Sequence, residues 1–306
     1  MKGLKHLLIA PPLLFFFAIS LVPLIFTIVL SLSGYSIGGS FSWVGVDNYV
    51  RLASDPLFTK SYVNTLLYVL IGVLVQYWLA LGIALLVNQV ASGSRPLRLL
   101  FLLPFMMPPL IVGFVWQTMF DSRYGPLSAL LRWLHIGPIF WLNEAKLAFT
   151  SILIVDTWQW TPFMFLILFA GLRTLPREPF EAARVDGASD WRIFWDHTFP
   201  MLLPASMAAI LLRAIEAFKL FDVVFYVTGG GPGGATSTVT LQGYFTALRS
   251  GNLGYGAAMS IVLLVTVMAL AMAALVWLKR LAGRRTRRME RELQAFSLEL
   301  QGRTAP

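Results

Sequence analysis

The sequence predicts an all-α integral membrane protein with six transmembrane helices. Of its 306 residues, 57% are hydrophobic and only 13% are charged. The mean hydropathy of +0.72 is too high for a soluble chain that buries a single core. Uncharged runs long enough for a bilayer-spanning helix recur along the chain. Helices are expected because a sheet with free edges cannot satisfy its backbone polar groups in lipid.

Six stretches of the chain are long and apolar enough to cross a bilayer, which takes about 20 residues per helix. Within a single domain of residues 1–306, we expect these spans at about 7–32, 62–88, 97–120, 147–172, 201–228 and 256–279. The first apolar run, Leu7–Leu30, exceeds the core of about 7 to 15 residues in a cleaved signal peptide, and no small-x-small site closes it. It is therefore expected to remain as a membrane helix.

The distribution of basic residues predicts that both termini are cytoplasmic. With a cytoplasmic amino terminus, 16 of the 24 Lys and Arg residues lie in segments on that side and six lie on the opposite side. The other two lie within the fifth span. Cytoplasmic loops of membrane proteins carry an excess of Lys and Arg, so this orientation is favoured.

The segment 279–306 is expected to be a basic cytoplasmic tail. It opens with Lys279 and Arg280, and four more arginines follow within eight residues. A basic cluster beside a membrane helix gains about 1 kcal/mol per residue from anionic lipid headgroups. Nucleic acid is the alternative partner, but no aromatic side chains are interleaved in this cluster for base stacking. We therefore expect a contact with membrane lipid and no nucleic-acid partner.

The sequence contains no pattern that predicts catalysis or a bound cofactor. A phosphate-binding loop needs glycines that lead into Lys and Ser or Thr, and the glycine-rich run 229–234 lacks that lysine. The sequence has no cysteine, and its histidines, His6, His135 and His197, are far apart, so no metal site is expected. This chain is therefore not expected to be an enzyme. If ATP drives the protein, another subunit is expected to bind it.

The inner segment 173–200 has the pattern of two short helices. Pro179 suits a first helical turn and Gly187 suits a helix stop, so a helix is predicted between them. Ser189 can cap a second helix, which Pro200 is expected to end. Two short helices at the cytoplasmic face indicate a docking element rather than a plain connector.

Small residues in the first of these helices favour contact with a partner protein. Ala182 and Ala183 allow a close approach, and Glu181 can pair with a cation of the partner.

The residues of this segment resemble a known motif. Glu181-Ala182-Ala183, with Gly187 four residues later and a turn that ends in Pro200, resembles the cytoplasmic EAA loop of ATP-binding-cassette (ABC) importer permeases. The similarity extends from about residue 12 to residue 278 and points to the maltose-type branch of sugar importers. Its other motifs are Leu103-Pro104, Trp158–Phe163, Phe221-Asp222 and Thr228–Pro232. The sequence departs from the family pattern at His197, where Ile is usual, and at Phe199, where Leu is usual.

This resemblance implies a type I ABC importer permease fold in a bacterial or archaeal plasma membrane. The implied partners are a homologous second permease in a heterodimer, a cytoplasmic ATPase dimer that holds ATP and Mg, and an extracytoplasmic solute-binding protein. The loop 173–200 would be a coupling element seated in a cleft of the ATPase. The coupling residues would be Glu181 as anchor, Ala182 and Ala183 packed in the cleft, and Asp186 and Gly187 at the turn.

Charged residues in the fifth span predict side chains that do not face lipid. Arg213, Glu216, Lys219 and Asp222 alternate in sign at steps of three residues, so each can reach its neighbour along a helix. A lone charge at mid-bilayer costs about 3 kcal/mol, which requires pairing or contact with protein and water. Asp156 in the fourth span could face a cavity, but we expect it to cap that helix.

The resemblance also implies that solute contacts come from the fourth and fifth spans, as they do in maltose-type permeases. Sugar hydroxyls need a few donors and acceptors, and aromatic faces cover the apolar C–H faces of a sugar ring. The candidate residues are Gln159, Trp160, Phe163, Arg213 and Glu216, with Ala217 and Leu220 on the same helical face as the last two. The alternative is that Arg213 and Glu216 form a structural ion pair at the interface with the second permease.

The sequence therefore predicts one transmembrane subunit of an ATP-driven importer for a sugar or sugar-like solute, such as an oligosaccharide or a polyol. Glycerol 3-phosphate is the alternative solute, because Arg213 would suit a phosphate, although Glu216 tends to neutralise it. An ion-coupled secondary carrier is the alternative of another class. Such a carrier would normally show two related halves and no docking element.

Overall fold

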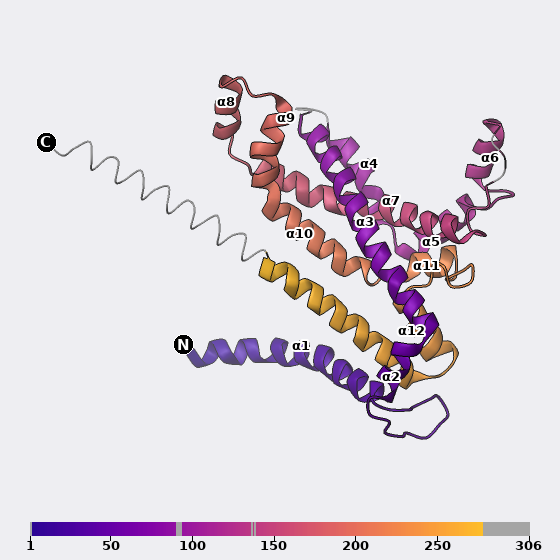
Figure 1. Cartoon of the computed structure of the whole chain (residues 1–306). Coiled ribbons are helices and arrows are strands. Elements are labelled where there is room, and N and C mark those ends of the chain that lie inside the picture. Colours follow the sequence, from indigo (N-terminus) through magenta and orange to yellow (C-terminus); the bar gives the residue numbers. More distant parts are fainter. Residues whose placement is uncertain (1, 90–93, 136, 138, 278–306) are drawn as a thin grey trace. The chain divides into compact units, whose positions relative to one another are not determined.

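The computed structural model describes residues 2–89, 94–135, 137 and 139–277, so the predicted basic tail lies outside the described residues. The chain divides into two compact units, Met1–Leu264 and Val265–Pro306. Helices make up most of the first unit, and the last described helix, Leu253–Trp277, runs from the first unit into the second (Figure 1). Among the described residues, extended pairing is limited to one bridge between Ser33 and Trp43. The predicted all-α class is confirmed.

The first unit contains long helices that are joined by short ones. They are α1 (Lys2–Ser31), α2 (Asp47–Ser54), α3 (Pro56–Gln89), α4 (Ser94–Met106), α5 (Pro109–Met119), α6 (Pro126–Trp133), α7 (Ala145–Arg173), α8 (Glu178–Val185), α9 (Asp190–Ile193), α10 (Phe199–Ala217), α11 (Asp222–Val227) and α12 (Val239–Tyr244). Two π-helical turns, η1 (Phe194–Thr198) and η2 (Phe245–Arg249), continue α9 and α12.

Five described helices are long and apolar enough to cross a membrane. They are Ala10–Ser31, Pro56–Gln89, Ala145–Arg173, Asp190–Ala217 and Leu253–Trp277. They correspond to the first, second, fourth, fifth and sixth predicted spans. A count of six, with both termini on one side, remains a prediction that depends on the third span.

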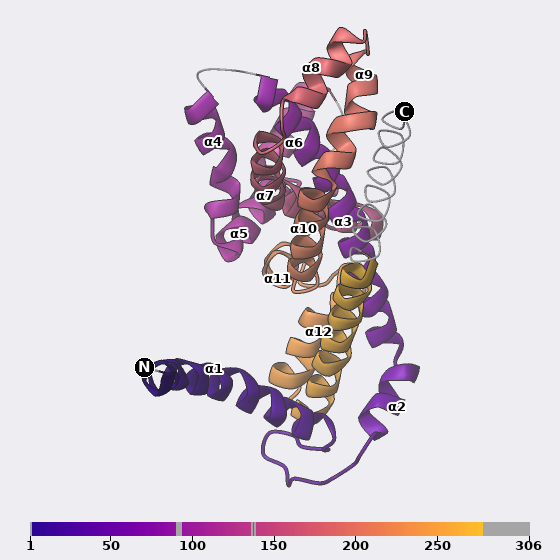
Figure 2. The same cartoon turned by 90° about the vertical axis from the view of Figure 1, so that its left-hand side faces the viewer.

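The third predicted span, 97–120, is not one helix. It is divided into α4 and α5 at Met107 and Pro108, and the two helices meet at a bend (Figure 2). Prolines at 104, 108 and 109 explain the break. Proline lacks a backbone N–H, and it disfavours the α conformation in the residue before it. Pro108 itself has an extended ψ of 133°.

The fifth span was predicted at 201–228, and the structure differs from this prediction at both ends. Its helix begins at Asp190, because α9, η1 and α10 form one continuous run to Ala217, so Pro200 does not end the second short helix. Pro200 lies in the first turn of α10. The π turn directly before α10 changes the hydrogen-bond register, so the missing N–H of Pro200 does not end the continuous helix. The helix then stops at Ala217, and α11 begins only at Asp222.

The core of the first unit lies where α3, α7 and α10 pack together. Tyr77, Leu81, Phe165 and Leu202 are fully or nearly fully buried in this cluster. Gly171 permits the crossing of α7 and α10, because a Cβ at that position would lie 2.6 Å from the Cβ of Ala205. Small residues at such crossings let membrane helices approach closely.

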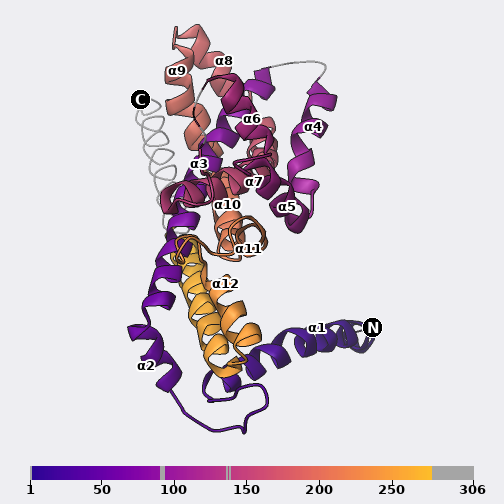
Figure 3. The same cartoon turned by 90° about the vertical axis from the view of Figure 1, so that its right-hand side faces the viewer.

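Helix α1 packs very little against the other helices of the first unit. None of its most apolar window in Ala10–Ser31 is buried, and Leu14 and Phe15 are each 69% exposed. Figure 3 shows the helix extending away from the α3, α7 and α10 group. A helix that is hydrophobic all round needs lipid or a protein partner to cover it.

A polar cluster around α2 fastens neighbouring elements of the first unit. The Asn48 side chain donates hydrogen bonds to the carbonyls of Ser31 and Ser33, at 2.9 and 2.8 Å. Asp55 caps α3 through the backbone N–H of Leu57, at 2.8 Å, and accepts a 2.6 Å hydrogen bond from the Tyr255 hydroxyl. The ends of α1 and α3 and the start of the Leu253–Trp277 helix are thus held together near α2.

The Asp55 cluster makes stability depend on pH. Burial acts to raise the pKa of Asp55. The hydrogen bonds from Tyr255 and from the backbone N–H groups of Phe58 and Leu57, with the charge of Arg51, outweigh that effect. The pKa therefore lies below its ordinary value of 3.8. A carboxyl with a depressed folded pKa adds stability above its unfolded pKa and loses it as the pH falls through the folded pKa.

We therefore predict that the melting temperature in detergent falls as the pH is lowered from about 5 to about 3, and that Asp55→Asn weakens this dependence. The measurement is a thermal unfolding scan at several pH values. Asp47→Asn, an exposed acid outside the cluster, is the matched control and should keep the native pH dependence. Equal pH slopes in the native protein and in Asp55→Asn would contradict the assignment.

Candidate functional site

The predicted coupling segment forms a helical hairpin of α8 and α9. Pro179 lies in the first turn of α8, as expected. The chain turns at Gly187, whose φ of 78° is in the left-handed region that glycine adopts without strain. The Ser189 hydroxyl caps α9 by accepting a hydrogen bond from the Arg192 N–H, at 3.4 Å. The predicted start, stop and cap of the hairpin are therefore confirmed.

A cleft of about 360 Å³ lies between the two helices of this hairpin. Four of the five predicted coupling residues line it: Ala182, Ala183, Asp186 and Gly187. The cleft thus presents small side chains and a carboxylate to an incoming group.

The exposed residues of the hairpin are the ones that a partner can reach. Glu181, Ala182, Asp186 and Gly187 are exposed, whereas Ala183 is only 7% exposed because it packs inside the hairpin. An Arg192 to Asp196 ion pair of 3.5 Å borders the cleft, with side chains 76% and 57% exposed. An ion pair this exposed adds little stability.

The His197 that replaces the usual Ile also lines the cleft. Its ring lies 6.5 Å from that of Phe180 on α8, measured between centroids. The substitution therefore adds a polar ring to the second wall of the cleft.

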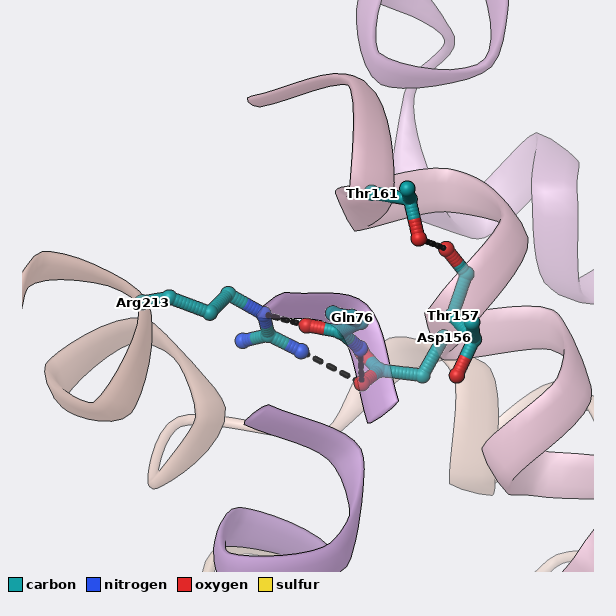
Figure 4. Close-up of polar contacts among 5 residues, drawn as sticks. All are labelled: Gln76, Asp156, Thr157, Thr161 and Arg213. Atoms are coloured by element: carbon teal, nitrogen blue, oxygen red, sulfur yellow. Dashed lines mark hydrogen bonds and ion pairs between the residues drawn. The ribbon is translucent and has the colours of Figure 1, made fainter. Parts of the chain in front are cut away.

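A second polar site lies in the core, where three buried side chains from three helices meet (Figure 4). Arg213 of α10 donates through Nε to Oε1 of Gln76 on α3, at 2.6 Å, and through Nη2 to Oδ2 of Asp156 on α7. Gln76 also donates to Asp156 Oδ2, at 2.8 Å. Arg213, Asp156 and Gln76 are 1%, 3% and 0% exposed. We call this set the Arg213 network.

The Arg213 network differs from one expectation, that Asp156 caps its helix, and from one alternative, that Arg213 pairs with Glu216. Asp156 does not cap its helix, because it lies near the middle of α7 and its carboxylate is required to neutralise Arg213. Arg213 does not pair with Glu216. That glutamate instead accepts from Lys219, at 2.7 Å, in a partly exposed pair. Desolvation decides both outcomes, since a buried guanidinium needs a buried carboxylate whereas exposed charges do not.

Two buried oxygens in and beside this network have no hydrogen-bond partner among the described residues. Asp156 Oδ1 and Gln159 Oε1 make no hydrogen bond to any part of the chain that the structure describes. The buried Tyr68 hydroxyl on α3 also has no hydrogen-bond partner among the described residues. Such unpaired polar atoms are rare in folded proteins, so each calls for an explanation.

An aromatic cluster lies next to the Arg213 network. The ring centroids of Phe105, Trp160 and Phe163 are 5.4 to 5.8 Å apart, and all three side chains are half-buried. Trp160 also stacks against the Arg213 guanidinium, whose central carbon lies 4.6 Å from the ring centroid. The cluster thus offers aromatic faces to an apolar surface and is backed by a cation.

The breaks in the third and fifth spans are stabilised by side chains. Gln159 donates to the Met107 carbonyl at the break between α4 and α5, at 3.2 Å. The Leu220 carbonyl, between α10 and α11, accepts from the hydroxyls of Thr238 and Thr240, at 2.9 and 2.7 Å. These bonds replace the helical ones that the breaks remove.

The structure divides the seven predicted path residues by exposure. Trp160, Phe163 and Glu216 are partly exposed. Those that are buried are Gln159, Arg213, Ala217 and Leu220.

Sequence reasoning missed Gln76 and Phe105. The only available signals were a lone Gln within an uncharged run and a Phe after Pro104, and neither identifies a partner that is more than 50 residues away.

No group of three or more potential metal ligands occurs in the described part of the chain.

Comparison with known proteins places the chain among transport permeases. A family model described as the binding-protein-dependent transport system inner membrane component matches residues 76–288. The trehalose/maltose transport system permease protein MalF of Thermococcus litoralis is 38% identical over 226 residues, which cover 74% of this chain and 76% of MalF. The sulfoquinovosyl glycerol transport system permease protein SmoG of Agrobacterium fabrum is 36% identical over 263 residues, 85% of each chain.

The fold is also that of a solved importer. A chain of a bacterial ABC transporter involved in the import of the acidic polysaccharide alginate matches with a TM-score of 0.81 over 91% of this chain and 96% of the other. Their sequences are 18% identical, so this similarity concerns the fold alone. With a family model that covers most of its length, the chain belongs to the binding-protein-dependent transport system inner membrane component family.

Proposed function

We propose that this chain is the transmembrane subunit of an ATP-driven ABC importer in a bacterial or archaeal plasma membrane, and that it forms half of the translocation path for a sugar or sugar-like solute. The observation that carries the proposal is the helical hairpin with its cleft, in a chain that belongs to a family of importer permeases. ATP and Mg would be held by a separate ATPase dimer. A homologous second permease and a solute-binding protein outside the membrane would complete the importer.

The hairpin has the properties that a coupling element needs. Glu181 and Asp186 are exposed and can pair with cations of the ATPase, while Ala182 leaves room for a close approach. Gly187 closes the cleft with a left-handed turn. Because α9 continues without interruption into α10, a displacement of the hairpin would reach the membrane core.

The solute path is proposed along the aromatic cluster and Glu216. Phe105, Trp160 and Phe163 would cover the C–H faces of a sugar ring, and Glu216 would accept hydrogen bonds from hydroxyl groups. Gln159, Arg213, Ala217 and Leu220 would support this path from behind.

A neutral solute is favoured over glycerol 3-phosphate, although UgpA of Agrobacterium fabrum, named for glycerol 3-phosphate transport, is 33% identical to this chain. The reason is that Arg213, the cation expected to attract a phosphate, is buried and already neutralised by Asp156. The relatives named for maltose or trehalose transport are consistent with a neutral sugar.

The first test addresses coupling to the ATPase. We predict that Glu181→Lys combined with Gly187→Trp lowers ATP-dependent uptake and recovery of the co-purified ATPase at least tenfold. The reason is that the lysine reverses an anchoring charge, while the tryptophan fills the cleft and strains a left-handed residue. The measurement is affinity purification from detergent, with ATP hydrolysis scored in the eluate and uptake measured in proteoliposomes.

Val185→Ala is the matched control for this test, because Val185 is 88% exposed on the same helix and does not line the cleft. It should behave as the native protein does. Native protein that purifies alone and transports solute without ATP would sink the importer proposal and favour an ion-coupled carrier.

The second test addresses the solute. We predict that the native importer takes up maltose or trehalose but not glycerol 3-phosphate, and that Trp160→Ala lowers sugar uptake about tenfold, because a stacking face is worth about 1 kcal/mol or more. Trp160→Phe should retain most of the uptake because it retains a ring. The measurement is uptake of each labelled solute into proteoliposomes that contain the cognate binding protein. Uptake of glycerol 3-phosphate alone would contradict the assignment.

A further inference from the structure

Helix α10 physically connects the hairpin to the Arg213 network. The run Asp190–Ala217 is one helix of 28 residues, with the cleft residue Arg192 near one end and Arg213 near the other. At a rise of about 1.5 Å per residue, these two arginines lie roughly 30 Å apart along the helix. A displacement of the hairpin is therefore transmitted to Arg213 without an intervening loop.

Two other contacts of α10 with its neighbours involve no charged group. Ala205 and Leu202 pack on Gly171 of α7, a contact between small and apolar groups. Ser206 and Tyr77 of α3 share one hydrogen bond between hydroxyls, at 3.0 Å. Arg213, in contrast, is charged and bonds to both α3 and α7. The guanidinium thus ties α10 to two neighbouring helices through charge-assisted hydrogen bonds.

A second set of acceptors stands beside the set in use. Arg213 bonds to Gln76 Oε1 and Asp156 Oδ2, while Asp156 Oδ1 and Gln159 Oε1 are buried and have no partner among the described residues. Oδ1 belongs to the carboxylate that Arg213 already contacts. Gln159 lies one helical turn further along α7, on the same face as Asp156. A guanidinium carries five N–H donors in a planar fork, which can bind two acceptors at once.

We propose that Arg213 is a positioning residue of the transport cycle and that its guanidinium exchanges acceptors as the hairpin moves. In the state seen here it binds Gln76 Oε1 and Asp156 Oδ2. In the other state it binds Asp156 Oδ1 and Gln159 Oε1. The inference rests on the proposed function, since it needs an ATPase to move the hairpin.

The exchange is physically inexpensive because the charge pair is never broken. A helix shift of about 1 to 2 Å, of the size seen at bistable interfaces, is comparable to the width of a carboxylate. The buried guanidinium keeps a carboxylate oxygen throughout, which avoids leaving an unpaired charge in the core. The shift would also move the guanidinium relative to the ring of Trp160. It would bring Gln159 into a hydrogen bond with Arg213, and Gln159 is the residue that donates to the Met107 carbonyl at the break before α5.

The test uses two variants that remove one acceptor each. Gln76→Met removes an acceptor of the present state together with the amide that donates to Asp156, and Gln159→Met removes an acceptor of the other state. The sequence has no cysteine, so spin labels can be placed at Leu212→Cys on α10 and Leu166→Cys on α7, both exposed positions. The distance between labels is measured in the assembled importer without nucleotide and in a vanadate-trapped ATP state, together with uptake and ATP hydrolysis.

We expect the native importer to change the label distance on trapping. Gln159→Met should remain at the nucleotide-free distance in both conditions and lower uptake at least tenfold for each ATP hydrolysed. Gln76→Met should shift toward the trapped distance without nucleotide. Lys146→Gln, at an exposed position in the first turn of α7, is the control and should match the native importer.

A further variant separates acceptor exchange from the bond to Met107. Gln159→Glu keeps an acceptor oxygen and, when ionised, cannot donate to the Met107 carbonyl, so exchange predicts that its label distance still reaches the trapped value on trapping. A label distance in Gln159→Glu that stays at the nucleotide-free value, or a native distance change in Gln159→Met, would overturn the proposal. Absence of ATP-driven uptake in the native importer would instead count against the proposed function itself.

Discussion

The need to neutralise a buried arginine organises the membrane core of this protein. Arg213 is 1% exposed and its partners Asp156 and Gln76 come from two other helices, so α3, α7 and α10 are all fixed by one charged group. Loss of one partner from a buried pair costs about 3 to 5 kcal/mol, because the remaining charge stays desolvated. Apolar packing at Gly171 and Ala205 brings α7 and α10 close together, but it does not by itself define how far one helix slides along the other. The polar network supplies that register.

The same requirement, that polar groups in a membrane core be satisfied, explains how two spans can be interrupted. Prolines break the third span at Met107, and Gln159 donates to the freed carbonyl. The fifth span stops at Ala217, and Thr238 and Thr240 donate to the Leu220 carbonyl. Irregular backbone at membrane depth is tolerated only when it is satisfied by protein or water. Because Gln159 is adjacent to Trp160 and one turn from Asp156, the first break, the aromatic cluster and the Arg213 network are parts of one region.

Local features of the fold could be predicted from the sequence, whereas long-range pairing could not. Ser189, Pro179 and Gly187 act through their own backbone, so the start, stop and cap of the hairpin were predictable and are confirmed. Apolar runs likewise identified five of the spans. The partner of Arg213 was not predictable, because periodicity along one helix favours Glu216 three residues away, while burial selects Asp156 on another helix. The prediction that Pro200 ends the second short helix was wrong, because a π turn before it lets the helix continue through the proline. Gln76 has no local signature at all.

A coupling element and a solute path can communicate only if something rigid joins them. In this chain the uninterrupted helix Asp190–Ala217 joins the hairpin cleft to Arg213, and Arg213 in turn lies 4.6 Å from the ring of Trp160. A flexible linker in place of η1 would absorb the movement of the hairpin, whereas a π turn preserves helical hydrogen bonding while it accommodates Pro200. The helix ends one turn after Arg213, so the proposed displacement of the hairpin would reach the network and would not be carried further along the same segment. Proteins amplify small shifts when a packed site has two discrete arrangements. In the proposed exchange, the oxygens of Asp156 and Gln159 that have no partner among the described residues would supply the second arrangement, near the point where this helix ends.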